Sequence, residues 1–264
     1  MGSDATTDEV LSHAVKGERV QGPDPEENVK LGKWTREALD RLIAEASRIP
    51  VPGERIEYLS RQFLGIPYGA STLIGNASTP EAFVINLEAV DCFTFLDYVE
   101  TMRLVRSFEE FAVRLREVRY RDGLVSFSSR NHFFTDWAHV LPSVRDLTRE
   151  AGGGFIRTVT KRLNVQSDGS LYLPGIEPRE RVVDYIPAAS IKNILGGLRA
   201  GDYIGIFADV PGLDVTHVGI FVGNNGQALF RHASSATNVR RVVDQPFLDS
   251  VADKPGIIVL RPVT

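Results

Sequence analysis

Cys92, His217 and His232 have the side chains that nucleophilic attack on an amide requires, a thiol and two imidazoles. Cys92 is the only cysteine of the 264-residue chain and directly follows an aspartate in the segment VDCFTFLDYVE. A thiol attacks a carbonyl carbon once a base accepts its proton, and the base works better when a third group orients it. The three residues could therefore act as nucleophile, base and orienting group.

The two histidines lie in HVGIFVGNNGQALFRHAS, where strand-like runs flank a turn-forming Asn-Asn-Gly. A two-residue loop at 224–225 would put His217 opposite His232, whereas a loop at 225–226 would put His217 opposite Ser234. Both registers keep the two imidazoles on one face, because side chains of a strand alternate with period two. A three-residue loop would separate them.

The same residue types allow other interpretations. A cysteine on an apolar helical stripe is usually a buried core residue. Two histidines on one face could be a polar patch, or a zinc site together with Cys92. In favour of chemistry, a helix amino end stabilises a thiolate, so we expect a lowered pKa at Cys92.

Helices are expected before the cysteine and strands after it. Apolar spacing predicts helices from residue 30 to the PVPG stop and over 54–65, 87–106 and 107–120, with a loop over 66–86. Strands are expected at 202–208, 217–223, 227–234 and 256–263. Helices followed by antiparallel strands indicate an α+β fold.

The middle of the chain is harder to interpret. The aromatic segment 123–139 alternates and favours a strand, 140–154 reads as a short helix closed by glycines, and 155–187 has no firm assignment. We expect a flexible arm over 1–29 and one domain over 30–264. Residues 121–190 are expected to be an insertion that shapes the cleft.

Composition excludes some partners. The formal net charge of −4, from 30 basic and 34 acidic residues, offers no electrostatic case for nucleic acid. No apolar run approaches the roughly 18 residues of a membrane-spanning helix. A single cysteine allows no intramolecular disulfide, and the start MGSDATTDEV lacks the pattern of a signal peptide.

Several motifs together resemble a known superfamily. IPY (66–68), DC before a helix (91–92), HVGIFVG (217–223) and FRHASS (230–235) are similar to the NlpC/P60 papain-like cysteine hydrolases, which cut amide bonds in peptidoglycan. NLEAVDCFTFLDYVE, SRNHFFTDW (129–137) and GDYIGIF (201–207) resemble the DUF1460 branch, similar to N-acetylmuramoyl-L-alanine amidases. The resemblance runs from about residue 56 to the C-terminus and is sparse in the middle third.

This resemblance implies roles for single residues. Cys92 would be the nucleophile, His217 the general base and His232 the orienting residue. Tyr68 would lie beside the cysteine and help to bind substrate or support an oxyanion, to which the backbone N–H of Cys92 would also donate. No metal or cofactor is needed.

Three further residues are candidates for substrate binding. Peptidoglycan endopeptidases of the superfamily read Asp-Cys-Ser-Gly, and their Asp and Ser hold a free amine; here Phe93 replaces that serine. This favours an amidase, whose substrate has an acylated nitrogen. Asp91 either contacts substrate or caps the helix. Arg130 could bind a substrate carboxylate or form a structural ion pair, with Asp136 as a candidate partner.

The sequence therefore predicts an α+β, papain-like amidase with its helical part packed on an antiparallel sheet. The expected substrate is a muropeptide, cut at the N-acetylmuramoyl–L-alanine bond through a thioester. The alternatives are a γ-D-glutamyl–diamino acid endopeptidase and a non-catalytic peptidoglycan-binding module. We expect a monomer of the cell envelope or periplasm whose leader is absent from this sequence, with the cytoplasm left open.

Overall fold

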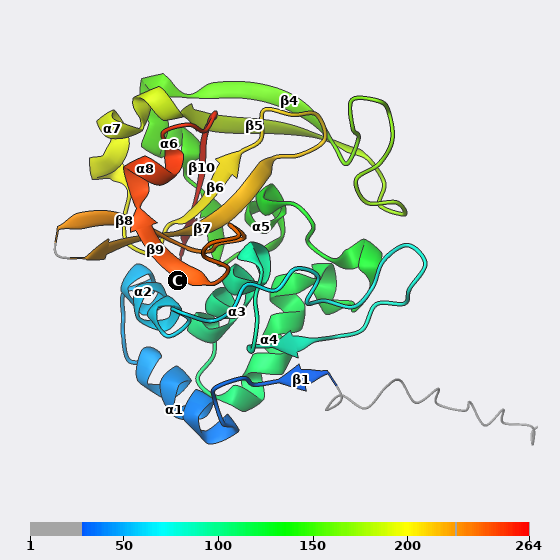
Figure 1. Cartoon of the computed structure of the whole chain (residues 1–264), viewed down its shortest axis with the longest axis vertical. Coiled ribbons are helices and arrows are strands. Elements are labelled where there is room, and N and C mark those ends of the chain that lie inside the picture. The colour runs from blue at the N-terminus through cyan, green and yellow to red at the C-terminus, as the bar shows by residue number, and fades with distance from the viewer. Residues whose placement is uncertain (1–27, 225, 264) are drawn as a thin grey trace, which may run out of the picture.

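The computed structural model describes residues 28–224 and 226–263 (Figure 1). The predicted arm lies outside these residues apart from its end, where Val29 belongs to strand β1 (Val29–Lys30) and pairs with Ile85 of β2 (Ile85–Asn86). Within the described part of the chain, no helix has the length and apolar character to cross a membrane.

Helices dominate the first half of the chain. The first four lie together in the lower half of Figure 1, below the large sheet, and the four shorter ones follow later in the chain. The helices are α1 (Arg36–Ala46), α2 (Pro52–Arg61), α3 (Cys92–Leu104), α4 (Phe108–Arg119), α5 (Phe134–Val140), α6 (Thr148–Gly152), α7 (Ile191–Ile194) and α8 (Phe247–Val251). Short 3₁₀ turns lie at Arg121–Gly123, Phe127–Ser129, Gly153–Phe155, Ala188–Ser190 and Leu195–Gly197.

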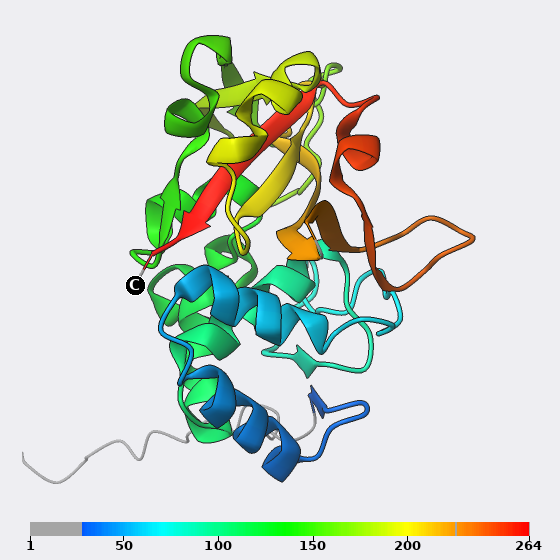
Figure 2. The ribbon, with the colours of Figure 1, turned by 90° about the vertical axis from the view of Figure 1, so that its left-hand side faces the viewer.

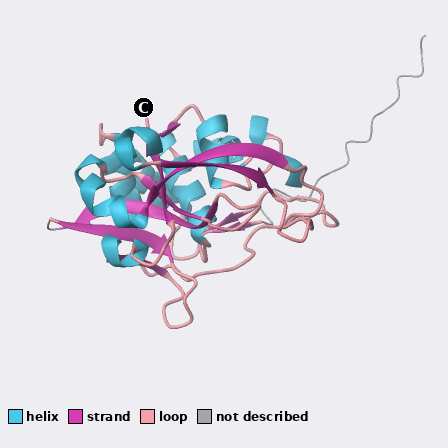
Figure 3. Cartoon of the chain, turned by 90° about the horizontal axis from the view of Figure 1, so that it is seen from above, coloured by secondary structure: helices cyan, strands magenta, loops and turns pink. Residues whose placement is uncertain are grey.

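The large sheet has eight strands, all paired antiparallel. Figure 3 shows the strands of the protein in magenta. Its order is β4-β5-β10-β6-β7-β8-β9, and β3 also pairs with β10. The strands are β3 (Val144–Asp146), β4 (Arg157–Leu163), β5 (Arg179–Pro187), β6 (Tyr203–Phe207), β7 (Val215–Asn224), β8 (Gln227–Ala233), β9 (Val242–Pro246) and β10 (Gly256–Pro262). The expected mixed fold with an antiparallel sheet is confirmed.

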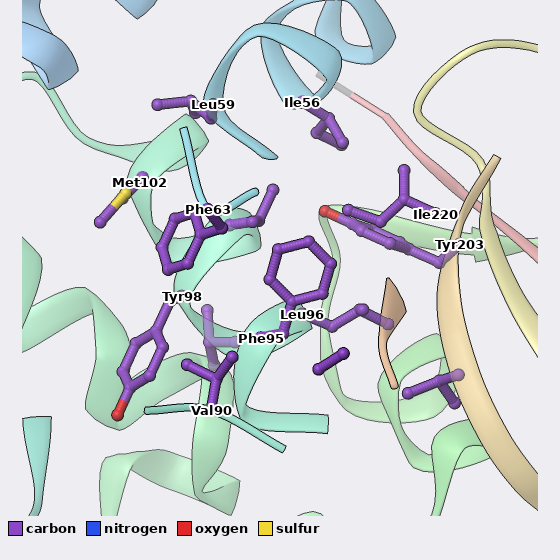
Figure 4. Packing of buried hydrophobic residues seen from close by; sticks show 14 of the residues in the cluster. Ile56, Leu59, Phe63, Val90, Phe95, Leu96, Tyr98, Met102, Tyr203 and Ile220 are labelled. Carbon is purple, nitrogen blue, oxygen red and sulfur yellow. The ribbon is translucent and has the colours of Figure 1, made fainter. Parts of the chain in front are cut away.

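Helix α3 is the centre of the larger core. Phe95 and Val99 of this helix are fully buried, and the cluster around them joins α1, α2 and α4 to strands β6 and β7. Figure 4 shows Phe95 in this cluster together with Ile56 of α2 and Tyr203 of β6. Figure 2 shows the sheet standing above these helices from a second side. Replacing a fully buried phenylalanine with alanine costs about 3–5 kcal/mol, so this packing holds the start of α3 firmly against the sheet.

A buried carboxylate also joins α3 to the sheet. Glu100 accepts a hydrogen bond from the Tyr203 hydroxyl of β6 at 2.6 Å and pairs with Arg103 at 2.6 Å. Ser143 donates to the other oxygen of Glu100 at 2.7 Å. Because a buried charge needs such partners, the register between α3 and β6 is strongly specified.

The structure corrects the assignment of segment 123–139. It contains a 3₁₀ turn and helix α5 rather than a strand, because Asp136 caps the start of α5 through the backbone N–H of Phe133 at 3.3 Å. Asp136 in turn pairs with Arg179 and Arg181 of β5, and not with Arg130. The strand-like alternation arises from aromatic residues that pack in an irregular segment. The helices expected from residue 30 and from residue 87 begin later, at Arg36 and Cys92.

Candidate active site

Cys92 is the first residue of α3, and Asp91 is its N-cap. The Asp91 Oδ1 atom accepts hydrogen bonds from the backbone N–H groups of Phe93 at 3.0 Å and Thr94 at 2.7 Å. The Thr94 hydroxyl completes a capping box by accepting from the Asp91 N–H at 3.0 Å. The cap therefore fixes the backbone on both sides of the cysteine and leaves the Cys92 N–H without a partner among the described residues.

The hairpin of β7 and β8 has the second of the two expected registers. Asn224 pairs with Gln227 and Ile220 pairs with Arg231, so residues 225–226 connect the strands. The pairing with β6 shifts between Ile206, opposite His217, and Phe207, opposite Val215. Such a bulge changes the direction in which side chains point, and here it lies directly before His217 in β7.

The two imidazoles contact each other directly. His217 Nε2 lies 2.7 Å from His232 Nδ1, and the ring planes are perpendicular with their centroids 4.8 Å apart. The second nitrogen of His232, Nε2, lies 2.7 Å from the side-chain oxygen of Gln245 in β9. His232 also stacks on Phe230, with centroids 4.9 Å apart.

This chain of contacts selects the tautomers. Since the Gln245 oxygen only accepts, His232 Nε2 carries a proton and its Nδ1 becomes an acceptor. His217 must then donate through Nε2, which leaves His217 Nδ1 unprotonated and without a partner among the described residues. A free imidazole lone pair is what a general base requires.

No sequence pattern singles out Gln245 as a site residue. It lies in the five-residue strand β9, VVDQP, which gives little strand signal because it is short and ends in proline. Arg231 holds this strand beside β8 through a bidentate ion pair with Asp244, at 2.7 Å for each bond. The same guanidinium donates to Ser60 of α2 at 3.0 Å and so ties the histidine strands to the helical part.

The Cys92 thiol lies against the backbone of Val218, the residue after His217. Among the residues that the structure describes, no hydrogen bond joins the thiol to an imidazole. Burial and the neighbouring Asp91 carboxylate raise the pKa of Cys92 to about 12, although backbone groups of Val218, Cys92 and Phe93 act in the opposite direction. The expected lowering of this pKa is therefore wrong, because desolvation outweighs the helix end.

Both imidazoles are neutral at neutral pH. Burial, with smaller effects of His232 and Lys254, lowers the pKa of His217 to about 3. Burial also lowers the pKa of His232, and the Gln245 hydrogen bond partly opposes it. The site thus combines a protonated thiol with neutral imidazoles, and not a thiolate with an imidazolium.

Tyr68 lies beside the cysteine helix. Its backbone bridges to Val90, and its N–H donates to the carbonyl oxygen of Arg240 at 2.9 Å. Burial raises the pKa of the Tyr68 hydroxyl, and the nearby Cys92 and Asp91 contribute in the same direction. The Arg240 guanidinium lies over the Tyr68 ring, 5.1 Å from its centroid.

Phe93 and Arg130 occupy different environments. Phe93 is half-buried and packs edge-to-face on Trp137, with centroids 5.8 Å apart. Arg130 pairs with the buried Glu81 through bonds of 2.5 and 3.0 Å, and Tyr120 donates to the same carboxylate at 2.8 Å. A role of Arg130 in binding substrate stays a prediction.

The geometry does not suit a zinc site made from Cys92, His217 and His232. Nε2 of His217 and Nδ1 of His232 are directed at each other, which leaves no room for a common ion between them. Over residues 28–224 and 226–263, no group of three or more histidine, cysteine, aspartate or glutamate side chains is arranged to hold a metal.

Solved structures resemble this fold closely. An N-acetylmuramoyl-L-alanine amidase from Bacteroides uniformis superposes with a TM-score of 0.65 at 30% identity, over 81% of this chain and 99% of that one. A putative xylanase from Bacteroides fragilis has a TM-score of 0.61 at 29% identity, over 76% and 98% of the two chains. A DUF1460 protein from Legionella pneumophila has a TM-score of 0.72 at 18% identity, over 87% and 94%, and shows the fold alone.

None of the curated proteins matches the chain. A family model does: residues 58–257 match AmiA-like, described as N-acetylmuramoyl-L-alanine amidase-like. The matched segment spans most of the chain and includes the cysteine, both histidines and Gln245. The chain belongs to the AmiA-like family of N-acetylmuramoyl-L-alanine amidase-like proteins.

Proposed function

We propose that the protein is a cysteine amidase that hydrolyses the N-acetylmuramoyl–L-alanine bond of peptidoglycan fragments through a thioester. The observation that carries this proposal is the chain from His217 through His232 to Gln245, which ends in an unprotonated nitrogen next to the segment that contacts Cys92. Family membership supports the substrate, and the papain-like NlpC/P60 mechanism is part of the proposal.

The first step is attack by the thiol. As the Cys92 sulfur bonds to the lactyl carbonyl carbon, its proton passes to His217 Nδ1. The resulting imidazolium is stabilised by His232, which accepts from Nε2, and by Gln245 behind it. Because the resting thiol and imidazole are not hydrogen-bonded, they must approach to about 3 Å when substrate binds, as is common for catalytic pairs.

The oxyanion would form at the amino end of α3. The Cys92 N–H is the first-turn donor that the Asp91 side chain does not use, so it can donate to the oxyanion. The Tyr68 hydroxyl can act as a second donor, because its raised pKa keeps it protonated.

Collapse of the intermediate breaks the bond between the carbonyl carbon and nitrogen. His217 gives its proton to that nitrogen, and the peptide leaves with a free amino group on L-alanine. Water then attacks the thioester while His217 accepts one of its protons. The lactyl carboxylic acid is released, and the proton on His217 returns to the Cys92 sulfur.

A second candidate, the γ-D-glutamyl–diamino acid endopeptidase, is favoured by one observation. Asp91 uses its Oδ1 atom for the cap, while its Oδ2 atom has no hydrogen bond with any described residue. A carboxylate oxygen beside the nucleophile could hold the free amine of a stem peptide. Phe93 opposes this, because its ring packs where the endopeptidases have a polar serine.

Two substrates separate the candidates. The enzyme is incubated with an anhydro-muramyl tripeptide and with the free tripeptide, and the products are identified by mass spectrometry beside a Cys92→Ala control. The amidase releases intact tripeptide and leaves the free tripeptide unchanged. Release of diaminopimelate, or faster cleavage of the free tripeptide, would contradict the proposal.

We also propose that the active protein is a monomer of the bacterial cell envelope.

A further inference from the structure

A pocket of about 450 Å³ opens beside the catalytic histidines. Its lining includes His217, His232 and Gln245 on one side and α8 with the residues after it on the other. Tyr68, Cys92 and Phe93 are not among its lining residues. The pocket therefore borders the proposed base but not the nucleophile.

Charged side chains of both signs line this pocket. Asp249, Asp253 and Lys254 are exposed there, and none of them forms an ion pair or a side-chain hydrogen bond within the part of the chain that the structure describes. Elsewhere, acidic residues of the protein are commonly paired, as Asp202 is with Arg261 at 2.6 Å. The positive charge of Lys254 contributes to lowering the pKa of His217. Unpaired charges of both signs around one hollow suit a zwitterionic ligand.

We propose that this pocket binds the leaving stem peptide, with Lys254 pairing a peptide carboxylate and Asp249 and Asp253 pairing the side-chain ammonium of its diamino acid. This inference rests on the proposed function, because it takes the acyl side of the substrate to be the muramic acid. It adds a specificity for the third residue of the peptide.

The position of the base gives the direction of the peptide. His217 must reach the leaving nitrogen to protonate it, so the chain that follows this nitrogen starts beside the imidazole. The same imidazole lines the pocket together with the buried Ser234 and the exposed Lys254. A stem peptide of L-alanine, γ-linked D-glutamate and diaminopimelate carries free carboxylates and a free ammonium along that direction.

Binding of the product tests this without turnover. The probe is the tripeptide L-Ala–γ-D-Glu–diaminopimelate, titrated calorimetrically into the Cys92→Ala protein. Adding Lys254→Ala should raise the Kd about two- to fivefold, the effect expected when one exposed ion pair is lost. The matched control is Lys192→Ala, since Lys192 is also exposed but lies in α7, outside the pocket.

The acidic residues give a second, separate readout. Asp249→Asn with Asp253→Asn should weaken binding of the tripeptide and leave unchanged the affinity for the dipeptide L-Ala–γ-D-Glu, which lacks the side-chain ammonium. Equal tripeptide affinities in the Lys254→Ala and Lys192→Ala proteins would overturn the inference. So would equal losses for dipeptide and tripeptide in the double Asn variant.

The two proposals fail in different ways. If the wild-type enzyme does not cut the muramyl bond, the proposed function fails while calorimetry still reports on the pocket. If the bond is cut and the substitutions at Lys254, Asp249 and Asp253 change neither the Kd nor the KM, the pocket inference alone fails.

Discussion

His217 donates its Nε2 proton to His232, and Nδ1 of His217 stays open for the proposed role as base. The oxygen of Gln245 is what sets this direction, because it requires a proton on the far nitrogen of His232. A third strand, β9, thus determines the protonation of a residue on β7.

Gln245→Ala should lower kcat about 10- to 100-fold with a smaller change in KM, because His232 can then adopt the other tautomer. Gln245→Glu should restore most of kcat, since a carboxylate also accepts from Nε2. The glutamate should raise the pKa of His232 and shift the pH profile. Gln227→Ala, an exposed change on β8, is the control. Similar kcat values for the Gln245→Ala and Gln227→Ala proteins would rule out the orienting role.

Alkylation of the resting enzyme should be slow. With the pKa of Cys92 raised to about 12, the thiolate is scarce at pH 7, and the rate with iodoacetamide should increase up to pH 10 without a plateau. Asp91→Asn keeps a good N-cap and removes the adjacent charge, so it should accelerate alkylation at pH 8. A rate that levels off below pH 8 would show instead that the thiol is ionised at rest.

Buried histidines should make the fold sensitive to acid. The pKa of His217 is lowered to about 3 and that of His132 to about 4, mainly by burial. Below about pH 6.5 the unfolded chain binds protons that the native protein does not. The free energy of unfolding is therefore at its full value above that pH and decreases as the pH falls. Urea unfolding should show this free energy decreasing by about 1.4 kcal/mol per pH unit for each histidine. His217→Asn should reduce that slope, and an unchanged slope would refute the assignment.

Arg130→Ala should destabilise the protein by about 3 kcal/mol, because it leaves the buried Glu81 carboxylate with the Tyr120 hydroxyl as its remaining partner. Replacing both ion partners, with Arg130→Met and Glu81→Gln, should recover part of this loss. Chemical denaturation of the wild type, the Arg130→Ala protein and the double variant measures their free energies of unfolding. If Arg130→Ala leaves stability unchanged while KM rises, Arg130 serves substrate binding rather than the fold.

Local signals predict the elements that carry the candidate site. Capping of the helix is one of the two roles expected for Asp91, and the alternating run around His217 indicates a strand; both depend on neighbouring residues alone. The sequence leaves two registers open for the hairpin, since Asn-Asn-Gly allows either two-residue loop. Contacts along the strands decide it in the folded protein.

Features that depend on distant contacts could not be predicted. Gln245 lies in a short strand whose pairing with β8 follows from tertiary packing. The direction of the Cys92 pKa shift depends on burial: a helix end contributes up to about 1 kcal/mol, whereas full burial can shift a pKa by several units. Residues 157–163 and 179–187 pair as long strands although their sequence alternates only modestly.

In the proposed mechanism, Cys92 carries the muramic acid as a thioester. Intact-protein mass spectrometry of a reaction with anhydro-muramyl tripeptide, quenched within milliseconds, tests it most directly. We predict a mass increase equal to the anhydro-muramoyl acyl group, located on Cys92 by peptide mapping and absent from the Cys92→Ala protein. An adduct carrying L-Ala–γ-D-Glu, or wild-type turnover by Cys92→Ala, would contradict it.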